Sequence, residues 1–489
     1  MRPGDDGLVA VASAPGKLIL FGEHSVVYGY AAVAAALSML RVHVRAEATS
    51  EGELVALLED LPSGIGSACI TLRASIPNLR KSMLNLSVDG LDSWRNPAPP
   101  SERSTVVLHE ALASVPEVDR APLIPLLFLC RAMLPELFVD LPVGDGLQDD
   151  LSSGKPLPAA AAAATYTGVH IRVRSADLPL GAGLGSSAAF SVALAAALLQ
   201  LRLRLFGGAE QKGGEGSLLD GLPVMLQESC ALVDAVCPGK AARTLINGWA
   251  YAAECILHGA PSGLDNQVSC MGGAIRHVRE AQTKRFDVVK AMPALRVLIT
   301  NTHVPRSTRA IVGQVAALHT SQPEVTTRIF EAIGAITERF LDLTCGKAHE
   351  ATATDADATA TLAATATPSE NTPISNGTAA CVSPSDVKII GSLVRMNHHL
   401  LCSLGVGCAA LEQAVDITHE EGLHTKLTGA GGGGCTFTVL GSAYTPLSDP
   451  IYAATMRART RLEARGFNCF ETQVGGHGAL WHVAADHAN

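Results

Sequence analysis

Aromatic and charged residues are scarce in this chain of 489 residues. Phe, Trp and Tyr make up 4% of the sequence and Asp, Glu, Lys and Arg only 17%, whereas 47% is hydrophobic. The formal net charge is −9, so the chain lacks the overall positive charge that would hold nucleic acid or an anionic membrane. We therefore expect no nucleic-acid partner and no membrane partner. An anionic substrate would have to be bound by a few local cations.

The 12 cysteines lack the spacing typical of a zinc site. No C-x-x-C pair occurs, and the most suggestive couple, Cys402 and Cys408, has no partnering set. Asp5 and Asp6 near the N-terminus, with no apolar run of signal-peptide type, argue against secretion. The most apolar segment, 121–141, is interrupted by charged residues and prolines and is therefore expected to be a core helix. The sequence predicts a cytoplasmic location and leaves a peroxisomal one open.

The chain also lacks a nucleotide loop that ends in Gly-Lys-Ser/Thr. Its most informative segment is instead P-L-G-A-G-L-G-S-S-A-A-F, from Pro179 to Phe190, in which glycines lead directly into a helical pattern. Glycine lets backbone N–H groups approach a polyphosphate closely, and the start of the helix favours the same anion. Taken alone, this spelling is equally compatible with a turn that packs a helix close to a strand.

Further segments share one order with this loop. S-A-P-G-K-L-I-L-F-G-E-H-S-V-V-Y-G (13–29) precedes it, and H-G-A-P-S-G-L-D-N-Q-V-S (258–269), N-T-H-V-P-R-S-T-R-A (301–310) and K-L-T-G-A-G-G-G-G-C-T-F (426–437) follow it. Together they resemble the signature motifs of the galactokinase, homoserine kinase, mevalonate kinase and phosphomevalonate kinase (GHMP) superfamily. Within it, the spellings are similar to the animal-type mevalonate kinases. The resemblance runs from about Val11 to about Thr472.

The resemblance implies an α/β (α+β) fold of two domains. The N-terminal domain, residues 1–290, would be ribosomal-protein-S5-like and bind ATP and substrate, and the C-terminal domain, residues 291–489, would be ferredoxin-like. Three segments rich in small or polar residues, about 142–165, 207–221 and 347–384, are expected to be inserted loops, and the first and last of them to be disordered.

Local patterns predict the elements that carry the motifs. We expect strands at 9–20, 42–48, 170–175, 295–300 and 435–440, and helices at 31–40, from Ser186 onward, at 245–257 and at 306–319. The third motif contains G-x-G-x-x-G, but a strand pattern follows it, which excludes a dinucleotide fingerprint because that motif opens a helix. His398 and His399 are expected to be packing or surface residues on a helix.

The resemblance also assigns roles to residues. Asp265 and Lys17 are the expected catalytic pair, in which Asp265 accepts or holds the proton of the substrate hydroxyl and Lys17 keeps that carboxylate ionised. Glu23, His24 and Thr308 are expected to contact the substrate, and Ser187 and Glu254 to hold Mg²⁺ through hard oxygen ligands. The residues expected to bind ATP are Pro179, Gly181, Gly183, Leu184, Gly185, Ser186, Ser187 and Ala188.

The activity implied is transfer of the γ-phosphate of ATP to the C5 hydroxyl of mevalonate, in isoprenoid and sterol precursor synthesis. Relatives of this type suggest a homodimer that isoprenyl diphosphates inhibit in competition with ATP. Two alternatives stay open at this point: another small-molecule kinase of the superfamily, acting on phosphomevalonate or homoserine, and a non-catalytic homologue that senses a ligand.

Overall fold

The computed structural model describes residues 8–61, 69–83, 93–138, 165–175, 178–206, 235–279, 284–289, 292, 295–345, 383–442 and 449–482. The expected inserted loop 207–221 lies outside these residues, as do 142–164 and 347–382 of the other two. Ser383 and Pro384, the last two residues of the expected 347–384 insertion, already belong to a helix: Ser383 is its N-cap, and its Oγ accepts a hydrogen bond from the backbone N–H of Asp386.

The N-terminal half is built on two long antiparallel strands, β1 (Val9–Phe21) and β2 (Ala32–Thr49). The outer part of β2 also pairs with β5 (Gly168–Arg174), which runs parallel to β3 (Glu53–Leu58). The remaining strands of this half are β4 (Ile70–Ser75), β6 (Ala235–Val236), β7 (Ala274–Arg279) and β8 (Lys284–Val288). The predicted strands at 9–20, 42–48 and 170–175 are confirmed.

The predicted helix at 31–40 is wrong, because these residues form the first part of β2. Alanine favours helices only weakly compared with what burial and pairing supply. The segment is hydrogen-bonded to β1 on one side and to β7 on the other. Ala34 and Ala36 pack with Leu264 and Val268 of helix α8 (Leu264–Met271). The small side chains therefore let a helix lie close to the sheet.

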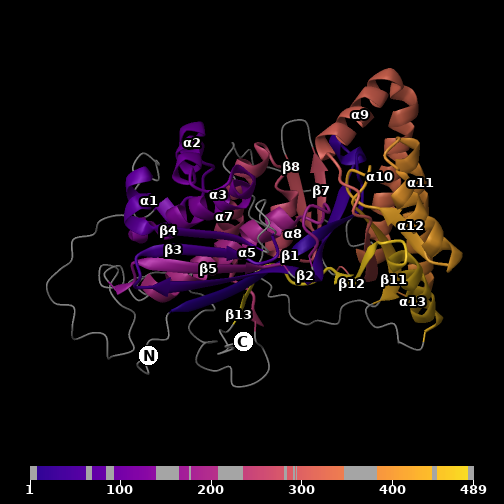
Figure 1. Ribbon diagram of the computed structural model, residues 1–489. Coiled ribbons are helices and arrows are strands. Elements are labelled where there is room, and N and C mark those ends of the chain that lie inside the picture. Colours follow the sequence, from indigo (N-terminus) through magenta and orange to yellow (C-terminus); the bar gives the residue numbers. More distant parts are fainter. Residues whose placement is uncertain are drawn as a thin grey trace, which may run out of the picture.

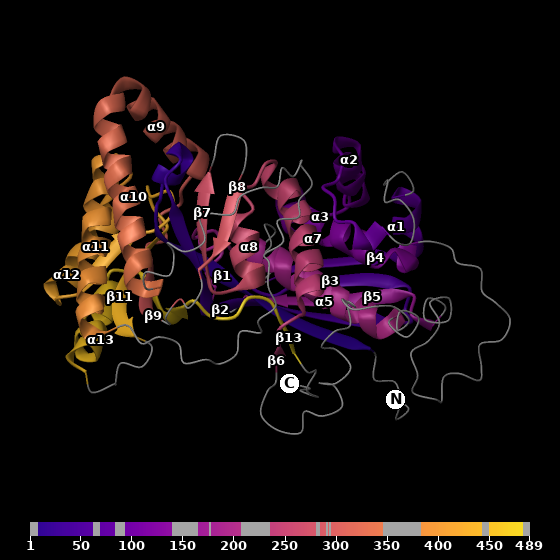
Figure 2. The same ribbon diagram turned by 180° about the vertical axis from the view of Figure 1, so that it is seen from behind.

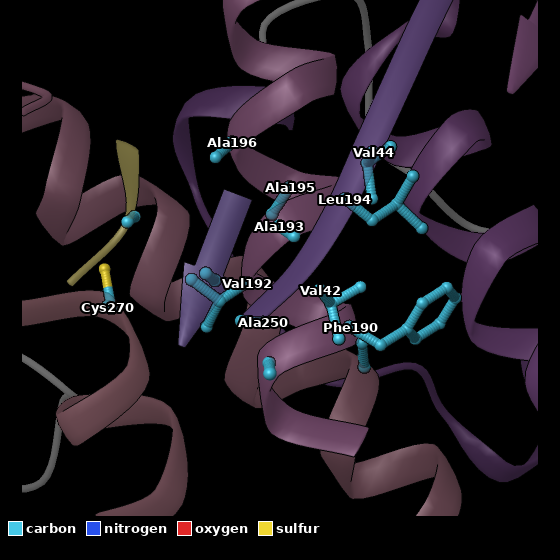
Figure 3. Packing of buried hydrophobic residues seen from close by; sticks show 14 of the residues in the cluster. Val42, Val44, Phe190, Val192, Ala193, Leu194, Ala195, Ala196, Ala250 and Cys270 are labelled. Carbon is cyan, nitrogen blue, oxygen red and sulfur yellow. The ribbon is translucent and has the colours of Figure 1, made fainter. Parts of the chain in front are cut away.

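Helix α5 (Ser186–Phe206) lies in the centre of the N-terminal core. Its side chains pack against Val42 and Val44 of β2 and against Ala250 of the neighbouring helix α7, residues Lys240–His258 (Figure 3). Among the described residues α5 is the one helix long and apolar enough to cross a membrane, and 94% of its most apolar window is buried inside the protein. The other helices here are α1 (Ile76–Ser82), α2 (Glu102–Ala111), α3 (Glu117–Met133), α7 (Lys240–His258) and α8 (Leu264–Met271), with the 3-10 turns η1 (Ser25–Tyr28), η2 (Ser93–Arg95) and η3 (Pro135–Phe138).

The C-terminal half follows a β-α-β-β-α-β order. Its strands are β9 (Leu295–Asn301), β10 (His424–Leu427), β11 (Cys435–Ser442) and β12 (Asn468–Val474), and they lie side by side in the order β10-β11-β9-β12. Its helices are α9 (Thr308–Ser321), α10 (Pro323–Cys345), α11 (Pro384–Ser403), α12 (Ala409–Glu420) and α13 (Pro450–Glu463). This arrangement confirms the ferredoxin-like domain, and the strand after the third motif is confirmed as β11.

The two halves share one continuous sheet. Figure 1 shows α1–α3 gathered at one end of the molecule and α9–α13 at the other, with β1 and β2 running between them, and the view from behind agrees (Figure 2). Val474 of β12 pairs with Leu37 of β2, and the last strand, β13 (Leu480–His482), pairs with Ser13 and its neighbours in β1. The expected domain boundary near residue 290 stays a prediction. Beyond that boundary, the chain returns to the N-terminal sheet with its strand β13.

Candidate active site

The Lys17 ammonium and the Asp265 carboxylate meet at the centre of the candidate site. Lys17 lies within β1, and Asp265 lies in the first turn of α8; Lys17 Nζ is 3.4 Å from Asp265 Oδ1. The lysine side chain is 8% exposed and the carboxylate 38% exposed. The Asp265 side chain thus has an ammonium beside it and remains open enough to contact a bound molecule. The structure thus brings the two expected catalytic residues together.

The glycine loop at 179–185 lies directly against this pair. The backbone N–H of Lys17 donates to the carbonyl oxygen of Leu184 at 2.7 Å, so the first motif and the loop are joined. Gly185 has a φ of +71°, and a Cβ there would lie 2.8 Å from Cγ of Lys17. Glycine is required at this position, both for the backbone conformation and for the close approach. Ser186, Ser187 and Ala188 then form the first turn of α5, where backbone N–H groups favour an anion.

Ser187 and Glu254 are also neighbours. The Ser187 hydroxyl donates to Glu254 Oε2 at 2.9 Å, and Ser191 donates to Glu254 Oε1 at 3.1 Å. His258, one helical turn after Glu254, places Nε2 3.4 Å from the same carboxylate. Burial raises the pKa of Glu254, against these favourable contacts. A buried carboxylate beside a hydroxyl, at the start of the helix that follows a phosphate-type loop, has the donor chemistry that suits Mg²⁺.

Glu23 and His24, both expected to contact the substrate, are enclosed in the protein. The Glu23 carboxylate forms an ion pair with Lys426, and Nδ2 of Asn397 donates to its other oxygen at 3.2 Å. Burial raises the pKa of Glu23 and lowers that of His24. The His24 ring places Nε2 2.9 Å from the carbonyl oxygen of Ala430 in the third motif. No sequence motif pointed to Lys426 and Asn397 as partners of this turn.

Arg306 connects the phosphate loop to the third motif, and it too was missed. Its guanidinium donates to the carbonyl oxygens of Thr428 at 3.1 Å, Gly433 at 3.4 Å and Ala182 at 3.5 Å. A Cβ at Gly183 would overlap that guanidinium. Thr308 follows two residues later, exposed at the start of α9, and Ser307 rather than Thr308 caps the helix by accepting from the N–H of Ala310.

Cys402 does have polar partners, contrary to the expectation from its spacing. His398 Nε2 is 3.3 Å from Glu412 Oε2, and the Cys402 thiol donates to Glu412 Oε1 at 3.1 Å, a set of donors that could surround a metal ion. However, the backbone N–H of Leu427 donates to His398 Nδ1 at 3.4 Å, and burial lowers the pKa of His398. The neutral ring therefore carries its proton on Nε2, which donates to Glu412 and has no lone pair for a metal. His398 is a packing residue, as expected, and it anchors the edge strand β10.

A lysine–carboxylate pair beside a glycine loop, on an S5-like domain joined to a ferredoxin-like domain, defines the class as a GHMP-type kinase. Residues 156–208 match the family described as GHMP kinases N terminal domain, and residues 379–445 match GHMP kinases C terminal.

The chain belongs to the mevalonate kinase family. It is 32% identical to the mevalonate kinase of Homo sapiens over 97% of this chain and 96% of that protein. It is also 31% identical to the mevalonate kinase of Schizosaccharomyces pombe over 88% of this chain and 82% of that one. The protein is therefore a kinase and uses a nucleotide.

Solved structures agree on the fold. The L. major mevalonate kinase crystallised with R-mevalonate superposes with a TM-score of 0.54 at 18% identity, covering 95% of this chain and 96% of that one. The Lactococcus lactis galactokinase with galactose superposes with a TM-score of 0.51 at 14% identity, covering 98% and 96%. Enzymes that act on different acceptors thus share this architecture, and the fold by itself does not specify the acceptor.

Proposed function

We propose that the protein transfers the γ-phosphate of ATP to the C5 hydroxyl of mevalonate, giving 5-phosphomevalonate and ADP. The observation that carries this proposal is the Lys17–Asp265 pair beside the 179–185 loop, in a chain that matches the human mevalonate kinase over nearly its whole length. Phosphoryl transfer needs positioned reactants and neutralised charge more than covalent help from the protein.

Each part of the proposed mechanism has residues to perform it. The 179–185 loop and the first turn of α5 would hold the phosphates through backbone N–H groups. Asp265 would accept the proton of the acceptor hydroxyl, or hold that proton by a hydrogen bond, while the Lys17 ammonium stabilises the negative charge that develops on the attacking oxygen. His24 and Thr308 would contact the acceptor.

Ser187 and Glu254 would hold Mg²⁺. When bound, the ion would neutralise charge on the phosphate oxygens. The support for this assignment is the 2.9 Å contact between the two side chains at the start of α5, together with the hard oxygen donors that they offer.

A coupled assay for ADP release tests the proposed acceptor. The enzyme would be supplied separately with mevalonate, phosphomevalonate, homoserine and galactose, and each product identified by mass. Turnover of mevalonate far above the other three is expected. Preference for phosphomevalonate or homoserine would transfer the proposal to another branch of the superfamily. ATP binding without turnover of any acceptor would instead support a ligand-sensing homologue.

Three further proposals have their support in the resemblance of the motifs. The protein would be a homodimer, would be inhibited by isoprenyl diphosphates in competition with ATP, and would act in the cytoplasm. Sedimentation velocity measures the first, inhibition kinetics at several ATP concentrations measure the second, and imaging of the tagged full chain measures the third.

A further inference from the structure

A buried cluster of three polar residues joins the first motif to the C-terminal half. Glu23 follows the end of β1, Lys426 lies in β10, and Asn397 lies in α11. The Lys426 ammonium contacts Glu23 Oε1, and Asn397 Nδ2 donates to Glu23 Oε2. The side chains of Glu23 and Lys426 are 1% and 0% exposed. Both oxygens of the carboxylate are therefore engaged inside the protein, and none is directed to solvent.

The surroundings of Lys426 complete this enclosure. Its ammonium lies 5.7 Å from the ring centre of Phe21 and 5.1 Å from that of Phe437, distances at which an aromatic face attracts a cation. Removing two charges from water costs free energy that their mutual attraction often fails to recover. A pair enclosed this completely is thus better explained by the geometry that it imposes than by stability.

The residue next to this ion pair in the chain, His24, has an unusual backbone conformation. Its φ is +60°, and within the described residues only one other non-glycine residue, His303, has a positive φ. Such a conformation is strained and persists when neighbouring contacts over-determine it. On one side, Glu23 is fixed by Lys426 and Asn397. On the other, the His24 ring contacts the carbonyl oxygen of Ala430, within a glycine-rich loop that has few side chains of its own to fix it.

We propose that Lys426 and Asn397 are positioning residues of the acceptor site: through Glu23 they hold the strained His24 and the loop around Ala430, and Glu23 itself does not contact the acceptor. This inference rests on the proposed function for the identity of the acceptor. It also changes the expected role of Glu23: instead of binding the substrate, Glu23 links the first motif to the third. Its partner Lys426 is 403 positions away in the chain.

Steady-state kinetics of Lys426→Met and Asn397→Ala test the proposal. We expect Lys426→Met to raise the KM for mevalonate by about tenfold or more, Asn397→Ala to raise it less, and both to leave the KM for ATP within about twofold of wild type, because the phosphate loop is untouched.

The matched control is Arg202→Met. It breaks another buried pair, in which Arg202 donates to both oxygens of Glu136 at 2.6 and 2.7 Å, with side chains 8% and 5% exposed, near the end of α5. This variant should lower the melting temperature and leave the KM for mevalonate unchanged. Equal increases of that KM in Lys426→Met and Arg202→Met would overturn the proposal, since the increase would then follow from a general loss of stability and not from the acceptor site.

The double variant Glu23→Gln/Lys426→Met separates geometry from stability, because it leaves no stranded buried charge. We expect its melting temperature to recover toward wild type while the KM for mevalonate stays high. Recovery of both together would show a purely structural role and would also overturn the proposal.

A readout that needs no substrate keeps this test independent of the proposed function. The ring resonances of His24, assigned with a His24→Gln variant, should shift in Lys426→Met and stay in place in Arg202→Met. If wild type turned over no mevalonate, the proposed function would fail, and the His24 resonances would still decide whether Lys426 positions that ring.

Discussion

The first motif carries two ion pairs that lie only six residues apart in the chain and differ in one property. Lys17 meets an Asp265 carboxylate that is 38% exposed, whereas Glu23 meets Lys426 with both side chains at most 1% exposed. We call them the open pair and the closed pair. A carboxylate that a reactant can reach is able to take part in the chemistry directly, as we propose for Asp265. A carboxylate enclosed on both oxygens can act only through the residues that it holds.

The largest effect is expected at the open pair. Asp265→Asn keeps the size of the side chain and removes the carboxylate proposed to accept or hold the proton, and it should lower kcat at least about a hundredfold. Nucleotide affinity should be nearly intact, because the 179–185 loop is unchanged. Rapid-quench kinetics and a fluorescent nucleotide titration measure the two quantities separately. Turnover within a few-fold of wild type would remove Asp265 from the mechanism.

Next in size is an effect on magnesium, close to the open pair. Glu254→Gln replaces the carboxylate proposed to bind Mg²⁺ by a neutral amide. It should raise the Mg²⁺ concentration for half-maximal activity at least about tenfold, with partial rescue at excess metal. Ser187→Ala should act in the same direction. Ser191→Ala, which removes only a hydrogen bond to the other oxygen of Glu254, should act less. An unchanged magnesium dependence in Glu254→Gln would place this residue outside the metal site.

The open pair could be anticipated from sequence and the closed pair could not. Lys17, Asp265, Ser187 and Glu254 lie in or beside short motifs, so a resemblance carries each to its position. The partner of Glu23 is 403 residues away, and a lone lysine in a short strand has no local signature of an ion pair. Arg306 was likewise missed as an anchor because its partners are backbone carbonyl groups, which any sequence supplies.

The fold shows the same division between local and distant causes. Alternating or apolar runs, such as 170–175 and 295–300, predict strands that form within about two residues of the expected positions. The alanine-rich stretch 31–40 has helical propensity and forms a strand nonetheless, since its pairing with β1 and β7 and its contact with α8 are non-local. Propensity fails where tertiary contacts are strongest.

A smaller effect is expected on stability in acid. Among the residues that the structure describes, burial lowers the pKa of four histidines, two of which, His24 and His398, lie near the closed pair. These histidines take up protons at a higher pH in the unfolded chain than in the folded one. Their contribution to the free energy of unfolding is therefore complete above about pH 6.5, and it is lost as the pH falls toward their lower pKa values in the folded protein.

A substitution at His277 measures how much one buried histidine contributes to this pH dependence of stability. It is 4% exposed, with its Nδ1 near the carbonyl oxygen of Arg285. The melting temperature of His277→Asn should fall less steeply between pH 7.5 and 5.5 than that of wild type. Identical slopes would show that the buried ring does not contribute.

The smallest effect is expected for the segment 347–382, which has almost no large apolar side chains, so burial could not offset the entropy of ordering it. Replacing it by a short Gly/Ser linker should leave mevalonate phosphorylation and the melting temperature almost unchanged, because both ion pairs and every motif are retained. Limited proteolysis of the intact protein should cleave there first.

The replacement must stop before Ser383. This residue caps α11, the helix that supplies Asn397 to the closed pair. A matched variant, in which the same linker is combined with Ser383→Ala, should lose about 1 kcal/mol of stability. If the closed pair positions the acceptor site, this loss should weaken mevalonate binding before it weakens nucleotide binding, as α11 frays from its first turn. A linker variant that kept Ser383, stayed folded and lost all activity would show that 347–382 contributes directly to the site or to a subunit contact.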